Sequence, residues 1–158
     1  MEVLPQAGPE PVRRDRLTSL LSRDAFLLTL DRELDRAARY ERELTVVVFD
    51  VAGLAAVNDR HGTEAGDRLR RSDGDAASTT LRRSDVAGRL GGDEFGVLLL
   101  ETGEHAGNRF LGRLRRALAG IEVSAGCVQF PDDAEDGAAL LRLADRRRNA
   151  SKGPQALE

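Results

Sequence analysis

The sequence predicts an α+β domain in which helices flank a mostly antiparallel central sheet. Three observations predict this fold class. The continuous β-branched run from Leu44 to Phe49 is typical of a buried central strand. Two apolar runs flank the turn Gly91-Gly92-Asp93-Glu94, as the two strands of a hairpin would. Apolar residues at helical spacing precede, separate and follow these strands, so the hairpin interrupts an alternation of helices and strands and excludes a purely parallel sheet.

The expected elements follow one another as helix, strand, helix, hairpin, helix, strand and helix. Ser22 is a plausible N-cap for the first helix, and Pro131 closes the last strand. Residues 52–66 have the composition of a turn, and the second helix is weak because Gly74 interrupts a thin apolar face. The elements are helix 23–41, strand 44–49, helix 67–83, hairpin strands 86–90 and 95–100, helix 104–119, strand 123–130 and helix 134–150.

Length and composition indicate one globular domain. The chain has 158 residues, of which 41% are hydrophobic and 32% are charged. Residues 1–14 are rich in proline, glycine and charge, so we expect a linker or N-terminal stub followed by one domain over 15–158. The net charge of −3 argues against a nucleic-acid or membrane-surface binder. The chain has no apolar stretch of about 18 residues, and its N-terminus lacks the apolar core of a signal peptide.

The single cysteine, Cys127, excludes a disulfide within the chain. A free thiol fits a reducing compartment. We therefore expect the domain to be cytoplasmic.

The hairpin turn carries residues that are more typical of a ligand-binding site than of a turn selected only for stability. Gly91 and Gly92 allow a ligand to approach the backbone closely, whereas Asp93 and Glu94 repel each other unless a cation or a donor lies between them. Asp50, at the end of the first strand, is a third acid that we expect nearby. Clustered carboxylates suit Mg²⁺. The alternative is a solvated turn without a ligand.

The residues around this turn resemble a known family. The run from Arg89 to Phe95, Arg-Leu-Gly-Gly-Asp-Glu-Phe, is similar to the name motif of GGDEF domains, the diguanylate cyclases. The resemblance covers nearly everything from Asp15 onward and implies the nucleotidyl-cyclase fold, with a ferredoxin-like palm. Five other segments resemble family motifs in the family's order: 15–23 (D-x-L-T-G-L-x-N-R), 49–59 (D-x-D-x-F-K-x-x-N-D), 62–67 (G-H-x-x-G-D), 124–131 (S-x-G-V-A) and 144–152 (A-D-x-A-L-Y-x-A-K).

The resemblance implies a reaction that joins two GTP molecules into cyclic di-GMP and releases pyrophosphate. Each domain binds one GTP, so catalysis requires a homodimer. By resemblance, Asp50 and Asp93 hold Mg²⁺, for which Mn²⁺ is a possible substitute. The metal stabilises charge on the transferring phosphoryl group, and Asp93 or Glu94 assists deprotonation of the attacking hydroxyl.

The resemblance also implies a set of substrate-binding residues. Asn58 and Asp67 match the pair that reads guanine, because a carboxylate accepts both N–H groups of the base and an amide donates and accepts. Gly91 and Gly92 lie along the nucleotide backbone. Lys152 is the only lysine of the chain and matches the phosphate-binding lysine. The alternative for Lys152 is an exposed lysine at a helix end.

A second site is implied by Arg82-Arg-Ser-Asp85. This segment fits the R-x-x-D pattern of the inhibitory site, which binds the product cyclic di-GMP, at the family's spacing from Gly91. Arg113 lies where the family places another arginine of this site. Arginine grips phosphate or guanine, and the carboxylate reads the base's N–H groups. The alternative is a surface ion pair, worth about 0–1 kcal/mol.

Several family residues are absent. Ala52 replaces the second aspartate of D-x-D. Ala55 and Ala156 replace two of three cationic phosphate ligands, each worth roughly 1.5–3 kcal/mol. Because the sequence ends in Gly-Pro-Gln-Ala-Leu-Glu158, we expect the family's terminal strand after G-R-N to be absent. Further departures are Ser19, Ser22, Gly53, Leu54 and Asn149.

This mixture of retained and lost residues predicts a weak diguanylate cyclase. The alternative is an inactive domain that binds cyclic di-GMP or GTP as a receptor. A third possibility is a dimerisation domain without a ligand, although the retained polar residues argue against it.

Overall fold

The computed structural model describes residues 14, 15, 18, 20–51, 81–103, 105–118 and 121–152. The turn expected over 52–66 and nearly all of the weak helix expected over 67–83 lie outside these residues. The elements are α1 (Arg23–Arg39), β1 (Leu44–Val51), β2 (Val86–Arg89), β3 (Glu94–Leu100), α4 (Ala106–Ala117), β4 (Val123–Phe130) and α5 (Gly137–Ser151).

The four strands form one sheet in the order β2-β3-β1-β4. Every neighbouring pair is antiparallel, which confirms the α+β fold class and the hairpin of β2 and β3. β1 lies inside the sheet between β3 and β4, and all but one of its residues are buried. Its β-branched composition suits this position, because a central strand is covered on both faces.

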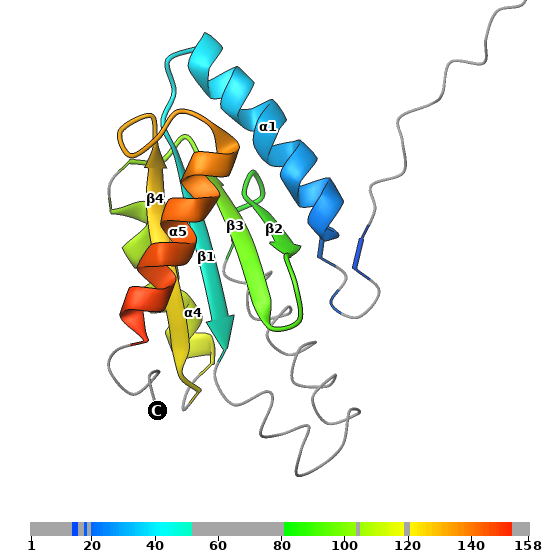
Figure 1. Cartoon of the computed structure of the whole chain (residues 1–158), viewed down its shortest axis with the longest axis vertical. Coiled ribbons are helices and arrows are strands. Elements are labelled where there is room, and N and C mark those ends of the chain that lie inside the picture. The colour runs from blue at the N-terminus through cyan, green and yellow to red at the C-terminus, as the bar shows by residue number, and fades with distance from the viewer. Residues whose placement is uncertain are drawn as a thin grey trace, which may run out of the picture.

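Helices cover both faces of the sheet (Figure 1). α1 and α5 pack on the face that carries Val46, Val48 and Leu98, whereas α4 packs on the face that carries Phe49 and Phe95. The helical spacing seen in the sequence thus marks real buried faces. None of the helices in the described part of the chain is long and apolar enough to cross a membrane.

α1 begins where the sequence predicts. The Ser22 hydroxyl accepts a hydrogen bond from the Ala25 N–H at 3.2 Å and so caps the first turn. Phe26 is fully buried, and its ring lies on Gly88 and Gly96, which face each other across β2 and β3. A β-carbon on either glycine would come within 2.7 Å of Phe26, so this close packing requires glycine.

α5 lies tightly against β4. Asp136 caps its first turn by accepting from the Ala139 N–H at 2.8 Å. A β-carbon on Gly126 of β4 would overlap the Ala144 carbonyl oxygen, so no side chain fits between helix and strand here. Leu140 and Ala144 are buried. Leu141 and Leu143 are only partly buried.

Candidate functional site

Two carboxylates meet where β1 ends and β3 begins. Asp50 and Glu94 are direct register partners in the antiparallel pair of β1 and β3, so their side chains lie on the same face of the sheet. Their side chains are 20% and 32% exposed. Asp93 precedes β3 in the turn and is partly buried. The structure therefore brings Asp50 to the hairpin turn, as the sequence predicts.

Two cations from α5 reach these carboxylates. The Nζ of Lys152 lies 2.8 Å from an Asp50 oxygen. Arg148 lies one helical turn earlier, and its Nη1 is 2.9 Å from a Glu94 oxygen while its Nε is 3.8 Å from Asp50. Arg148 also approaches Asp145 at 3.6 Å. These charges offset one another, which explains how two carboxylates can share one small region.

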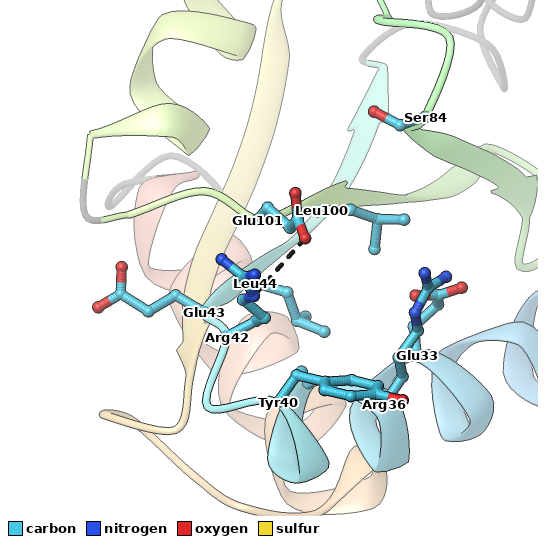
Figure 2. Close-up of a pocket in the computed structure, with 10 residues that line it drawn as sticks. Glu33, Arg36, Tyr40, Arg42, Glu43, Leu44, Ser84, Leu100 and Glu101 are labelled. Atoms are coloured by element: carbon cyan, nitrogen blue, oxygen red, sulfur yellow. Dashed lines mark ion pairs between the residues drawn. The ribbon is translucent and has the colours of Figure 1, made fainter.

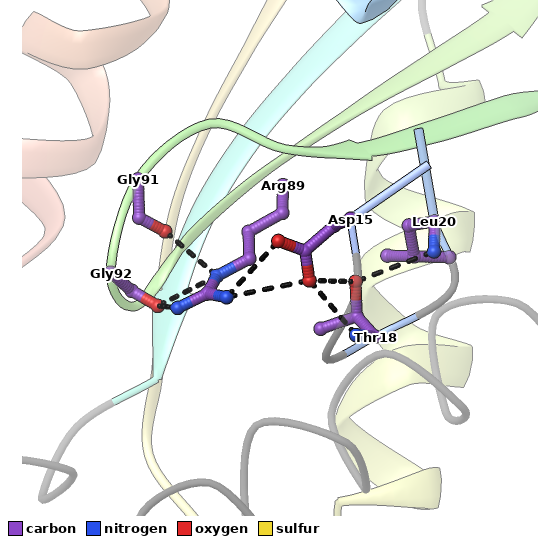
Figure 3. Close-up of polar contacts among 6 residues, drawn as sticks. All are labelled: Asp15, Thr18, Leu20, Arg89, Gly91 and Gly92. Carbon is purple, nitrogen blue, oxygen red and sulfur yellow. Dashed lines mark hydrogen bonds and ion pairs between the residues drawn. The ribbon is translucent and has the colours of Figure 1, made fainter. Parts of the chain in front are cut away.

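Arg89 fixes the shape of the glycine turn (Figure 3). Its guanidinium donates to the Gly91 carbonyl at 3.3 Å and to the Gly92 carbonyl at 3.1 and 3.2 Å. The same group pairs with Asp15 at 3.2 Å. Asp15 in turn accepts from the backbone N–H and the hydroxyl of Thr18, at 2.8 and 2.9 Å. A chain of polar contacts thus links the N-terminal segment to the turn.

Asp15 is stabilised as a carboxylate. Partial burial alone would raise its pKa, but the hydrogen bonds from Thr18 and the charge of Arg89 outweigh burial and lower the pKa of Asp15 below its usual value. Gly91 and Gly92 themselves are exposed, and a β-carbon on either would meet no atom within 4 Å. The turn is therefore held from one side and open on the other.

Comparisons with known proteins identify the family to which this fold belongs. Residues 12–155 match the family profile described as diguanylate cyclase, GGDEF domain. The chain belongs to the GGDEF domain family. It is 34% identical to the diguanylate cyclase DgcP of Pseudomonas aeruginosa over 143 residues, which are 84% of this chain and 21% of DgcP. The chain spans between 19% and 33% of the length of three curated relatives that it matches.

Solved GGDEF structures have the same fold. The isolated GGDEF domain of TpbB from Pseudomonas aeruginosa superposes with a TM-score of 0.83 at 31% identity, covering 89% of this chain and 88% of that one. The GGDEF domain of DgcB from Caulobacter crescentus, solved in complex with cyclic di-GMP, gives a TM-score of 0.80 at 26% identity, covering 90% and 93%.

The acidic pair of this GGDEF domain does not fit a divalent metal in the arrangement seen. The oxygens of Asp50 and Glu94 already contact the side-chain cations Lys152 and Arg148. Among the residues that the structure describes, no group of three or more His, Cys, Asp or Glu side chains is placed to hold a metal ion. Metal binding by Asp50 and Asp93 stays a prediction.

The segment of the second site forms a closed turn. One Asp85 oxygen accepts from the Arg82 N–H at 3.1 Å, and the other accepts from the Leu100 N–H of β3 at 3.2 Å. The Asp85 N–H donates to the Arg82 carbonyl at 3.1 Å. Arg82 is exposed, and Arg113 on α4 is partly buried. Asp85 is therefore a structural residue of this turn, whatever else it binds.

A cavity of about 380 Å³ lies at the other end of the strands (Figure 2). Tyr40 and an ion pair between Arg42 and Glu101, at 3.8 Å, lie along its wall. Leu44 starts β1 and Leu100 ends β3, so this cavity is separate from the acidic pair at Asp50.

Some expected site residues lie outside the described residues. They include the guanine-reading pair Asn58 and Asp67, and the substituted positions Ala52, Ala55 and Ala156. Their roles stay predictions.

Arg148 contacts both carboxylates but was not predicted from the sequence. This residue stands where the motif A-D-x-A-L-Y-x-A-K, aligned on Lys152, has its leucine. A cation in place of an apolar residue, four positions before the lysine expected to bind phosphate, was the available signal.

Proposed function

We propose that this GGDEF domain is a cyclic-di-GMP signalling domain of diguanylate cyclase type with weak turnover. It would condense two GTP molecules into cyclic di-GMP and release two pyrophosphates. The observation that carries the proposal is the pairing of Asp50 with Glu94 beside the open Gly91-Gly92 turn, with Lys152 in contact. This set supplies anionic and cationic groups beside one open turn.

The residues of this chain have distinct roles in the proposal. The Lys152 ammonium would leave Asp50 for the phosphates of GTP, while the open glycine turn admits the nucleotide backbone. Asn58 and Asp67 would read guanine, and Asp93 or Glu94 would accept the proton of the attacking 3′-hydroxyl.

The loss of expected phosphate-binding cations is the reason to propose weak turnover. Ala55 and Ala156 remove two cationic phosphate contacts, each worth roughly 1.5–3 kcal/mol. GGDEF diguanylate cyclases are in general metal-dependent, and Mg²⁺ or Mn²⁺ is the cofactor that the family implies. The ion pairs of Asp50 and Glu94 with α5 oppose such a metal.

The reaction would need two copies of the domain. Each copy holds one GTP, and each 3′-hydroxyl attacks the α-phosphorus of the nucleotide on the other copy. A homodimer is therefore part of the proposal, and the use of GTP keeps a cytoplasmic location as its expected setting.

A second candidate is a receptor that binds cyclic di-GMP without turnover. It is favoured by the Arg82–Asp85 turn, which two backbone-anchored hydrogen bonds hold in shape before any ligand arrives, with Arg82 exposed. Preorganisation of this kind lowers the entropic cost of binding. Arg113 would complete the site.

One experiment separates the two candidates. Purified protein is incubated with GTP and Mg²⁺, cyclic di-GMP is assayed, and cyclic di-GMP binding is measured in parallel. Product that disappears in Asp93→Ala supports the cyclase. Binding without product, abolished in Arg82→Ala, supports the receptor. Protein that neither forms product nor binds cyclic di-GMP would overturn both and leave the dimerisation domain.

A further inference from the structure

We propose that Arg148 acts as a built-in cation that takes the place of a divalent metal between Asp50 and Glu94. This inference rests on the proposed function, because it assumes that Asp50 belongs to a nucleotide site. Its consequence is that the domain binds Mg²⁺ or Mn²⁺ well only when the guanidinium moves away.

The contacts of Arg148 support this role. Its side chain is only 12% exposed, and it lies 2.9 Å from Glu94 and 3.8 Å from Asp50. Within the described part of the chain, Lys152 forms its ion pair with Asp50 and none with Glu94. Arg148 is therefore the group that bridges the two carboxylates, which is the position a shared cation would take.

The backbone holds Arg148 in place. Gly126 packs directly on α5, and a β-carbon there would lie 2.7 Å from the Arg148 backbone nitrogen. One turn later, the Ser151 hydroxyl accepts from the Ala125 N–H at 3.2 Å. Because helix and strand are fixed to each other at both points, the guanidinium can leave the acids only by a change of side-chain rotamer.

The electrostatics disfavour a metal while Arg148 stays. Mg²⁺ binds carboxylate oxygens at about 2.0–2.1 Å, so on Glu94 it would lie a few ångströms from the guanidinium. Like charges at that separation repel strongly in a partly buried site. In addition, the metal would have to displace the ion pairs that the guanidinium makes with the two carboxylates. Leucine at this position, as in the family motif, would impose neither cost.

The test measures metal binding directly, without nucleotide. Mn²⁺ binding is followed by electron paramagnetic resonance for the wild type, Arg148→Leu and Arg148→Gln. Arg146→Leu is the matched control, because it removes the same charge from an exposed position two residues earlier on α5. Circular dichroism and thermal unfolding, with and without Mn²⁺, verify that each variant folds.

We expect Arg148→Leu and Arg148→Gln to bind Mn²⁺ about tenfold or more tightly than the wild type and Arg146→Leu, because one like charge is removed. Mn²⁺ should raise the unfolding temperature of the Arg148 variants only. A further Glu94→Gln change should abolish the gain. Equal Mn²⁺ affinity in the wild type and in a folded Arg148 variant would overturn the inference.

A cyclic-di-GMP assay on the same samples keeps this inference apart from the proposed function. Suppose that Arg148→Leu binds Mn²⁺ more tightly but neither the wild type nor any variant forms cyclic di-GMP. This result would support the role of Arg148 and refute the proposed cyclase activity. If the wild type forms cyclic di-GMP in a metal-dependent way and binds Mn²⁺ as tightly as Arg148→Leu, the cyclase activity would be supported and the role of Arg148 refuted.

Discussion

A single arginine shapes the glycine turn of this domain. Gly91 and Gly92 have no side chains, so their conformation depends on what their carbonyls contact. Arg89 binds both carbonyls and is itself anchored by Asp15. Removing the anchor should therefore loosen the turn although Asp15 lies far from it in sequence.

Asp15→Asn should destabilise the domain by about 1–2 kcal/mol at neutral pH, because a partly buried charge-assisted contact becomes neutral. The lowered pKa of Asp15 sets the pH dependence. A carboxylate with a depressed pKa stabilises the fold above its unfolded value of 3.8, and this contribution fades as the pH falls through the folded value. Urea unfolding at pH 7 and at about pH 3 measures the difference.

The exposed Asp132→Asn variant serves as the control for Asp15. It should lose little stability at either pH, since it lies outside this network. A stability gap for Asp15→Asn that is the same in acid as at pH 7 would refute the charge-based explanation.

Lys152 is the expected phosphate-binding cation of the proposed site. Lys152→Met should weaken binding of a non-hydrolysable GTP analogue by about tenfold or more, the equivalent of one charged hydrogen bond. Isothermal titration calorimetry measures this, with Arg146→Met as the charge-matched control. Unchanged affinity would leave Lys152 as a helix-end residue that pairs with Asp50.

At the scale of elements, the close contact between β4 and α5 positions the cations of the site. Gly126→Ala should force α5 away from the sheet, because the new β-carbon overlaps backbone rather than a movable side chain. We expect a loss of about 3 kcal/mol in the free energy of unfolding, at the upper end for overpacking. Chemical denaturation measures it.

Gly112→Ala is the matched control for Gly126. Gly112 lies in α4, and a β-carbon there meets no atom within 4 Å. This change should stabilise the domain by about 0.5–1 kcal/mol, because alanine favours a helix over glycine. If Gly126→Ala proves as harmless as Gly112→Ala, α5 is not fixed to the sheet in the way described.

The elements that the structure describes could be predicted because each has a local signal. Ser22 marks the start of α1, and the run from Leu44 marks β1, so both were placed within two residues. α5 begins three residues later than the apolar pattern suggests, at Gly137. The reason is that Asp136 accepts from Ala139 and so acts as the cap, which the pattern of apolar residues does not reveal.

The direction in which each arginine side chain of α5 points could not be predicted from local sequence signals. Arg147 and Arg148 are adjacent and chemically identical, yet Arg147 reaches Asp133 at 3.1 Å and the Cys127 carbonyl at 2.7 Å, whereas Arg148 reaches the acids. Which one enters the site depends on how α5 rotates against Gly126. That rotation is a property of tertiary packing.

At the scale of the whole molecule, the position of the proposed site at one end of the sheet suggests that two copies of the domain must face each other. The turn between β2 and β3 lies at one end of the sheet (Figure 1). Asp50 and Glu94 lie at the same end, and Gly91 and Gly92 in the turn are exposed. One such end holds one GTP in the proposed reaction. A second copy is then required to supply the other nucleotide, so the rate of turnover depends on how often two copies of the domain meet.

The need for two copies to meet predicts how the rate depends on protein concentration. While the domain is mostly monomeric, the initial rate of cyclic-di-GMP formation should rise with the square of protein concentration, a logarithmic slope of about 2 by mass action. Fusing a dimeric coiled coil before residue 15 should lower the slope to about 1 and raise the rate at low concentration. Asp93→Ala should give no product in either form. A slope of 1 for the unfused domain, with sedimentation showing monomer throughout, would mean that one copy suffices and that the facing-domain mechanism is wrong.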